Sequence, residues 1–174
     1  MNLQTHSHRR LNLLTGEWVL VSPHRTQRPW QGLVEREPAT ALSAYVADCY
    51  LCPGNSRASG QRNPAYSGPF AFDNDFPALT SATASAAGSA ASPLLVSEAE
   101  SGSCRVVCFS EHHNLCLADM SPGAALEALR FLVQEWHRLD ARDDIGYVQV
   151  FENRGEMMGC SNPHPHAQIW ATAH

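Results

Sequence analysis

The segment at positions 162–170, with the sequence NPHPHAQIW, constrains the fold more than any other part of this chain. Each of its histidines, His164 and His166, follows a proline. Proline fixes its own φ angle and pushes the residue before it towards extended geometry, so the segment is held in a stiff, strand-like form. Alternate residues of an extended segment lie on one face. We therefore expect His164, His166 and Gln168 to project together. Ile169 would face the opposite side.

Two imidazoles and an amide on one rigid platform suit a specific chemistry. An imidazole can be a metal ligand, a nucleophile or a general base, and an amide can donate a hydrogen bond to a phosphoryl or carbonyl oxygen. Surface histidines at the start of a strand are the plain alternative, which a lone histidine would favour. The convergence of both histidines with Gln168, in a chain with further metal-ligand candidates, instead favours a functional site.

Hydrophobic patterns along the chain predict an α+β domain with a mainly antiparallel sheet and long loops. Ser121 and Pro122 provide an N-cap and a first-turn proline, and apolar residues then recur at helical spacing as far as Leu139. This pattern predicts one amphipathic helix over 122–139. Apolar runs next to turn residues predict strands at 17–22, 104–109, 147–152 and 167–171. The aromatic run at 70–76 lies in a region that we expect to be irregular.

Length and composition restrict the class of protein. The chain has 174 residues, 44% of them hydrophobic, which is enough for one globular domain. Its formal charge of −5 gives no basic footprint for nucleic acid. No apolar run approaches membrane-spanning length, and the N-terminus lacks the apolar core of a signal peptide. We therefore expect a cytoplasmic protein without a nucleic-acid or membrane partner. Residues 80–93, rich in Ala, Ser, Gly and Thr, are expected to form a flexible loop.

Cys49 and Cys52 form a Cys-x-x-Cys-Pro-Gly knuckle. Without a secretory signal, the six cysteines are expected to be reduced thiols rather than three disulfides. Tetrahedral zinc requires four sulfur or nitrogen ligands, and the knuckle supplies two. Since no second Cys-x-x-Cys pair exists, two histidines would complete a structural zinc site, and the best-placed candidates are His112, His113 and His164. Redox-active or plain structural thiols are the alternatives.

Other residues are candidates for binding a nucleotide. Arg25 and Arg28 can bind phosphate because the planar guanidinium matches its geometry, although loop arginines are often plain surface charges. Phe72 offers an aromatic face for a base, unless it belongs to the core. Asn74 and Asp75 offer polar groups for the sugar hydroxyls.

These motifs together resemble the galactose-1-phosphate uridylyltransferase family. The matching stretches run nearly end to end, at positions 15–25, 28–32, 49–54, 74–79, 150–153 and 158–170. The last stretch is highly specific to the family, whereas the histidine-triad superfamily shares only a looser His-x-His-x core. The resemblance implies a histidine-triad-like α+β domain.

The resemblance also implies a ping-pong transfer of UMP. His166 would attack the α-phosphorus of UDP-glucose and release glucose 1-phosphate, and galactose 1-phosphate would then take the UMP to give UDP-galactose. Gln168 would donate a hydrogen bond to a phosphoryl oxygen as charge develops. The other residues that the resemblance assigns to the substrate are Arg25, Arg28, Leu51, Phe72, Asn74, Asp75, Asn153, Gly159 and Ser161.

A zinc site and a homodimer follow from the same resemblance. In family members, the counterparts of the two loop arginines reach phosphate across a dimer interface. The zinc ligands that the resemblance assigns are Cys49, Cys52, His164 and His113, with His112 as the alternative to the last.

Family members carry a second, similar half, so residues 1–174 correspond to the N-terminal catalytic domain with the C-terminal half absent. Two other functions are compatible with the motifs. One is a nucleotide phosphorylase or hydrolase of the histidine-triad superfamily, in which phosphate or water accepts the nucleotide. The other is an inactive, zinc-stabilised nucleotide-binding fragment.

Overall fold

The computed structural model describes residues 8–21, 43–81, 100–155, 158–160 and 162–173 of the chain. The chain divides into two units, Met1–Ala39 and Thr40–His174. In the first unit, strand β1 (His8–Leu11) pairs with strand β2 (Trp18–Val21) in an antiparallel hairpin. The turn contains Gly16, whose φ of 73° favours glycine and whose N–H donates to the Asn12 carbonyl. Strand β2 confirms the strand predicted at 17–22 as far as the described residues reach.

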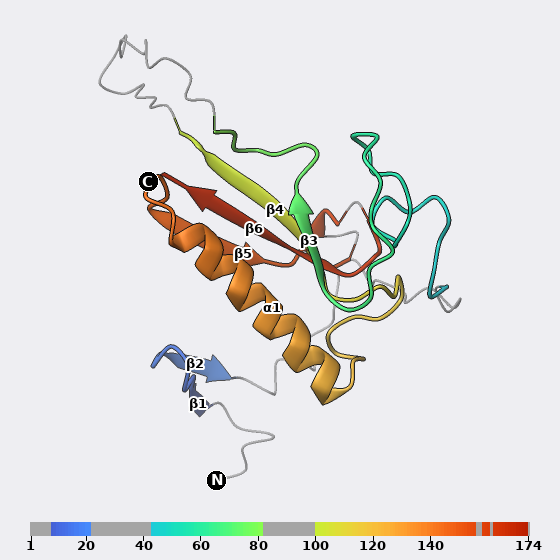
Figure 1. Ribbon diagram of the computed structural model, residues 1–174. Coiled ribbons are helices and arrows are strands. Elements are labelled where there is room, and N and C mark those ends of the chain that lie inside the picture. The colour runs from blue at the N-terminus through green and yellow to red at the C-terminus, as the bar shows by residue number, and fades with distance from the viewer. Residues whose placement is uncertain (1–7, 22–42, 82–99, 156–157, 161, 174) are drawn as a thin grey trace. The chain divides into compact units, whose positions relative to one another are not determined.

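The second unit is built on a four-stranded antiparallel sheet with the strand order β3-β4-β6-β5 (Figure 1). Its strands are β3 (Phe70–Asp73), β4 (Gly102–Cys108), β5 (Tyr147–Phe151) and β6 (His166–Thr172). Helix α1 (Pro122–Asp140) follows β4 in the chain and runs along one face of the sheet (Figure 1). This arrangement confirms the predicted α+β fold with an antiparallel sheet.

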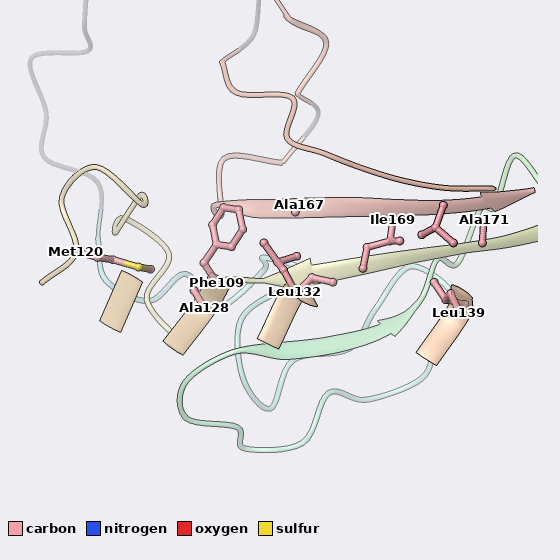
Figure 2. Close-up of a cluster of buried hydrophobic side chains, with 10 residues drawn as sticks. Phe109, Met120, Ala128, Leu132, Leu139, Ala167, Ile169 and Ala171 are labelled. Atoms are coloured by element: carbon pink, nitrogen blue, oxygen red, sulfur yellow. The ribbon is translucent and has the colours of Figure 1, made fainter. Parts of the chain in front are cut away.

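Helix α1 begins where the sequence predicts. The Ser121 hydroxyl accepts a hydrogen bond from the Ala124 N–H at 3.3 Å, which satisfies one of the amides left free in the first turn. The buried side of the helix then packs against the sheet. This core consists mainly of Ala128, Leu132 and Leu139 of α1 with Val107, Val148, Ala167, Ile169 and Ala171 of the strands (Figure 2).

The opposite face of the sheet carries the even-numbered residues of β6. In the β4–β6 pairing, His166 lies opposite Cys108 and Gln168 lies opposite Val106. Because side chains alternate along a strand, His166 and Gln168 share the face that points away from α1. This orientation agrees with the prediction for His166 and Gln168, whereas His164 precedes the strand and its ring faces Cys52. A second apolar cluster covers this face beside them, and it contains Cys49, Leu51, Cys52, Phe72, Val106 and Cys108.

Strand β3 corrects the expectation that the aromatic run at 70–76 is irregular. The sequence of β3 is FAFD, with Ala71 packed against the core under α1 and Phe72 buried in the second cluster. A four-residue strand with apolar side chains on both faces shows no clear alternation, so its pattern does not distinguish strand from loop. Of the predicted flexible loop, residues 82–93 lie outside the described residues. The helix in the described part of the chain lacks the apolar length that a bilayer crossing requires.

Candidate active site and metal centre

A buried set of two cysteines and two histidines lies at the end of the sheet where β6 begins. Cys49, Cys52, His113 and His164 are all buried, and their ligand atoms lie within 4.8 Å of one another. The Cys52 Sγ lies 3.5 Å from His164 Nδ1 and 3.6 Å from His113 Nδ1. This set is a candidate Cys2His2 metal-binding site, which matches the tetrahedral sulfur and nitrogen ligation of structural sites. The alternative histidine, His112, has a side chain 48% exposed and lies beside Glu111 instead.

Amide side chains hold the cysteine knuckle in place. The Asn55 side chain donates to the carbonyls of Val46 and Cys49 at 2.9 and 2.8 Å. The buried Asn63 donates to the Cys52 carbonyl at 3.1 Å and to that of the intervening Tyr50. These hydrogen bonds help to shape the knuckle, because they give its backbone carbonyls protein partners.

The protonation chemistry of the cluster suits a cation. Burial lowers the pKa of His164 to about 4 and also lowers the pKa of His113, so both imidazoles are neutral and have a lone pair to donate. Burial raises the pKa of the Cys52 thiol to about 11, and the neighbouring Cys49 raises it further. Two thiolates close together in an apolar site are unfavourable without a counter-charge. A divalent cation supplies that charge and reverses the preference. The residues present therefore fit a bound metal ion.

One carbonyl determines which nitrogen of His164 faces the cluster. The His164 Nε2 lies 3.0 Å from the Ser110 carbonyl oxygen. Since a carbonyl only accepts, Nε2 carries the proton and Nδ1 presents its lone pair to the cysteines. Such a hydrogen bond to the remote nitrogen of a metal-ligating histidine fixes the orientation of the ring. Asn162 contributes further, because its Oδ1 accepts the His164 N–H at 3.0 Å.

The first residue of β6, His166, is oriented by the same histidine. Its Nδ1 lies 2.7 Å from the His164 carbonyl oxygen, so Nδ1 must be the protonated nitrogen. The Nε2 of His166 therefore has the free lone pair. The ring is half-buried on the sheet face opposite α1. The geometry gives an oriented imidazole whose outer nitrogen can act as a nucleophile or base.

Gln168, two residues further along β6, lies on the same sheet face. Its Oε1 accepts a hydrogen bond from the indole N–H of Trp170 at 3.3 Å. Trp170 itself packs edge-on against Phe151, with ring centroids 5.5 Å apart. Because the amide oxygen is engaged, the amide NH₂ group is the end that can donate to a ligand.

The residues predicted to bind the nucleoside lie in and after β3. Phe72 and Leu51 are buried in the second apolar cluster. After the strand, the Asn74 Oδ1 accepts the Phe76 N–H at 2.9 Å, which tightens the turn. The Asp75 carboxylate accepts the Ser59 N–H at 3.3 Å. The segment that contains Ser59, which follows the cysteine knuckle in the chain, therefore contacts Asp75.

Of the remaining predicted residues, the structure describes Asn153 and Gly159. Asn153 follows the end of β5, close in register to Gln168. Gly159 has a φ of 78°, a conformation that a side chain would strain. Three predicted residues lie outside the described part of the chain, namely Arg25, Arg28 and Ser161.

Several residues of this region are not evident from the sequence. Arg57 lies over the ring of Phe72, Trp170 holds the amide of Gln168, and Asn162 caps the backbone of His164. Asn162 had a local signal, because Asn before Pro favours a turn in which its side chain accepts a backbone N–H. Arg57 had no such signal, since its contacts depend on long-range folding.

The antiparallel sheet, the long helix α1 and the oriented histidine on the inner strand β6 define an α+β domain with an adjoining candidate metal centre. Comparison with known proteins takes the assignment further. The family model described as "Galactose-1-phosphate uridyl transferase, N-terminal domain" matches residues 1–174. The chain therefore belongs to the galactose-1-phosphate uridylyltransferase family.

Individual relatives agree with this assignment. The chain is 42% identical over 183 residues to galactose-1-phosphate uridylyltransferase of Cryptococcus neoformans, which covers 99% of this chain and 47% of the relative. It is 44% identical over 168 residues to the Haemophilus influenzae protein of the same name, covering 97% and 47%. The chain thus spans about half the length of the curated relatives that it matches.

Solved structures support the fold. A uridylyltransferase structure aligns with a TM-score of 0.58 at 24% identity, covering 94% of this chain and 45% of that one. An ADP-glucose phosphorylase from Arabidopsis thaliana with bound ADP-glucose aligns with the same TM-score of 0.58 at 22% identity, covering 98% and 50%.

Proposed function

We propose that this chain carries the nucleotide-transfer half of a UDP-glucose–hexose-1-phosphate uridylyltransferase. The observation that carries the proposal is the hydrogen bond between His166 Nδ1 and the His164 carbonyl, at 2.7 Å. In the tautomer that this hydrogen bond favours, the lone pair lies on Nε2, as an attacking imidazole requires. Membership of the family supplies the substrate class.

The first half-reaction forms a covalent uridylyl-histidine. The His166 Nε2 lone pair attacks the α-phosphorus of UDP-glucose, a nitrogen–phosphorus bond forms, and the phosphorus–oxygen bond to glucose 1-phosphate breaks with its electrons on the leaving phosphate. The Gln168 NH₂ donates to a non-bridging oxygen as negative charge develops there. An oxygen of galactose 1-phosphate then attacks the same phosphorus, giving UDP-galactose and free His166. The phosphoramidate keeps the phosphoryl group activated while the two sugar phosphates exchange.

Zinc is the metal that we assign to the Cys2His2 set. Two thiolates and two neutral imidazoles in a closed site are the ligands of a structural zinc. Bound there, zinc would tie the knuckle loop to the segment that leads into β6. His164 would serve both ends of this arrangement, since its ring faces the cysteines and its carbonyl orients His166.

The substrate contacts remain predictions. Asn74 and Asp75 are assigned to the nucleoside, with Leu51 and Phe72 as its apolar wall. Arg25, Arg28 and Ser161 are assigned to the phosphates, and Asn153 and Gly159 to the lining of the nucleotide pocket. Assembly as a homodimer and a cytoplasmic location belong to the same proposal.

Incubation with UDP-glucose tests the first half-reaction. Intact-mass spectrometry should show a UMP-sized adduct on the wild-type chain, with release of an equal amount of glucose 1-phosphate. His166→Gly should show no adduct, whereas His112→Gly, a matched change at the exposed histidine, should behave as wild type.

The acceptor is tested by a chase of the isolated adduct. Galactose 1-phosphate should remove the UMP and yield UDP-galactose. Removal by water or inorganic phosphate alone would indicate a hydrolase or phosphorylase instead. Absence of any adduct on wild type would contradict the proposal and indicate a nucleotide-binding module.

A further inference from the structure

Arg57 lies in a short hairpin between the metal knuckle and β3. Ser56 and Arg62 form an isolated antiparallel bridge, and the Arg57 N–H donates to the Gln61 carbonyl at 2.7 Å. The hairpin turns at Gly60, which has a φ of 85°. The hairpin is short and internally bonded, so it can hold the Arg57 side chain in one place.

The Arg57 guanidinium makes two contacts with residues assigned to the nucleoside. Its carbon lies 4.4 Å above the centroid of the Phe72 ring, and its Nε lies 3.7 Å from Asp75 Oδ1. Only 9% of the Arg57 side chain and 12% of the Asp75 side chain are exposed. A cation on an aromatic face beside a carboxylate is favourable when both are shielded from water.

Asp75 is thereby held from two directions. One carboxylate oxygen accepts the Ser59 N–H, and the other faces the guanidinium. The separation of 3.7 Å is that of an ion pair, and the buried Arg57 Nε has no hydrogen-bond partner among the described residues. The guanidinium therefore acts on Asp75 by charge and packing, and it holds the carboxylate in place with lone pairs available to an O–H or N–H donor.

We infer that Arg57 is a positioning residue for the nucleoside-binding carboxylate Asp75, a role that rests on the proposed function. Through its hairpin, Arg57 also links the knuckle to the nucleoside pocket. The Arg62 Nε donates to the Gly54 carbonyl at 2.6 Å, and the Gly54 N–H donates to Pro64. A merely structural Arg57 would pack the hairpin onto Phe72 without affecting ligand affinity.

Calorimetric titration with UDP-glucose separates these roles. Arg57→Gln should raise the Kd about tenfold, because it removes the charge that holds the carboxylate. Arg57→Lys, which keeps a cation, should stay within about threefold of wild type. Arg138→Gln removes a cation whose side chain is 70% exposed and pairs with Glu135 rather than with Asp75, so it is the matched control and should leave the Kd within about twofold.

A double-mutant cycle completes the test. If Arg57 acts through Asp75, Arg57→Gln should weaken binding no further in an Asp75→Asn background. Independent effects in the cycle, or an unchanged Kd in Arg57→Gln, would overturn the inference. Binding that depends on Arg57 without adduct formation would overturn only the proposed transfer reaction. A wild-type chain that does not bind UDP-glucose would overturn both.

Discussion

At the scale of single residues, the amide that we propose to be catalytic, Gln168, contacts a neighbour two positions along its strand. Gln168 can donate to a phosphoryl oxygen only if its NH₂ end points at the ligand. The indole N–H of Trp170 binds the amide oxygen at 3.3 Å and so favours that orientation. Trp170 is fixed in turn by its edge-on contact with Phe151. Donor orientation before substrate arrives is the property that makes such groups effective in catalysis.

We expect Gln168→Ala to slow adduct formation by about 100-fold at saturating UDP-glucose, the usual cost of removing one charge-stabilising donor. Trp170→Phe, which removes only the indole N–H, should slow it by about tenfold, the loss of one hydrogen bond. Rapid-quench measurement of the uridylyl adduct gives both rates. Tyr147→Phe is a suitable control because it deletes a hydroxyl that bonds only Gln149 on the same strand. A Trp170→Phe rate equal to wild type would show that the indole has no orienting role.

Residues that belong to short sequence motifs were predictable, whereas residues whose contacts are distant in the sequence were not. The proline-flanked histidines and the Cys-x-x-Cys pair form short motifs, so His164, Cys49 and Cys52 were predictable as members of one metal set. The choice between His112 and His113 required coordinates, because the two are adjacent and only the fold buries one of them. The role of Arg57 could not be predicted from the sequence, because Arg57 and Asp75 are 18 positions apart and only the fold brings them together.

At the scale of elements, α1 is joined to the sheet by charge as well as by apolar packing. The buried Glu135 of α1 lies 3.1 Å from Arg105 Nε of β4 and 2.7 Å from Arg138 Nη1 of its own helix. The contact with Arg105 has ion-pair distance but not hydrogen-bond alignment, since neither atom has a hydrogen-bond partner in the described part of the chain. Glu135 is only 1% exposed, so these two cations compensate for the burial of its carboxylate.

Glu135→Ala should therefore lower the free energy of unfolding by about 3 kcal/mol, because it leaves the largely buried Arg105 with only the exposed Asp73 carboxylate, 3.9 Å away, as an ion-pair partner among the described residues. Arg138→Ala is the matched comparison, and it should cost under about 1 kcal/mol because that side chain is 70% exposed. Urea denaturation followed by circular dichroism measures both values. Equal losses in the two variants would mean that burial does not govern this ion-pair network.

Elements also differ in how clearly their sequences specify them. Helix α1 was predictable because 19 residues give several turns of apolar periodicity and Ser121 supplies a cap. Strand β3 was not, because its four residues are too few to show a period, and only pairing with β4 defines it. The longer strands β4 and β6 were predicted from the sequence with bounds correct to within one or two residues.

At the scale of the whole second unit, the sheet separates two kinds of core. One face packs against α1, and the other face packs against the knuckle loop that contributes Cys49 and Cys52. The loop has little regular structure, so its order depends on the amide hydrogen bonds and on the metal set. Loss of the metal should therefore affect the two faces unequally.

We expect the chain to bind one equivalent of zinc and to lose UDP-glucose binding when a chelator removes it. The helical circular dichroism signal should persist, because α1 packs on the opposite face. At a zinc concentration 1,000-fold above Kd, binding contributes about 4 kcal/mol, so the Tm should fall by about 10 °C on removal. Cys52→Ser should reproduce these effects, while Cys116→Ala, a buried thiol outside the metal set, should retain zinc.

If the chelated chain still bound UDP-glucose with unchanged affinity, the metal would not support the nucleoside pocket. If its helical signal collapsed together with binding, the two faces of the sheet would fold as one inseparable unit.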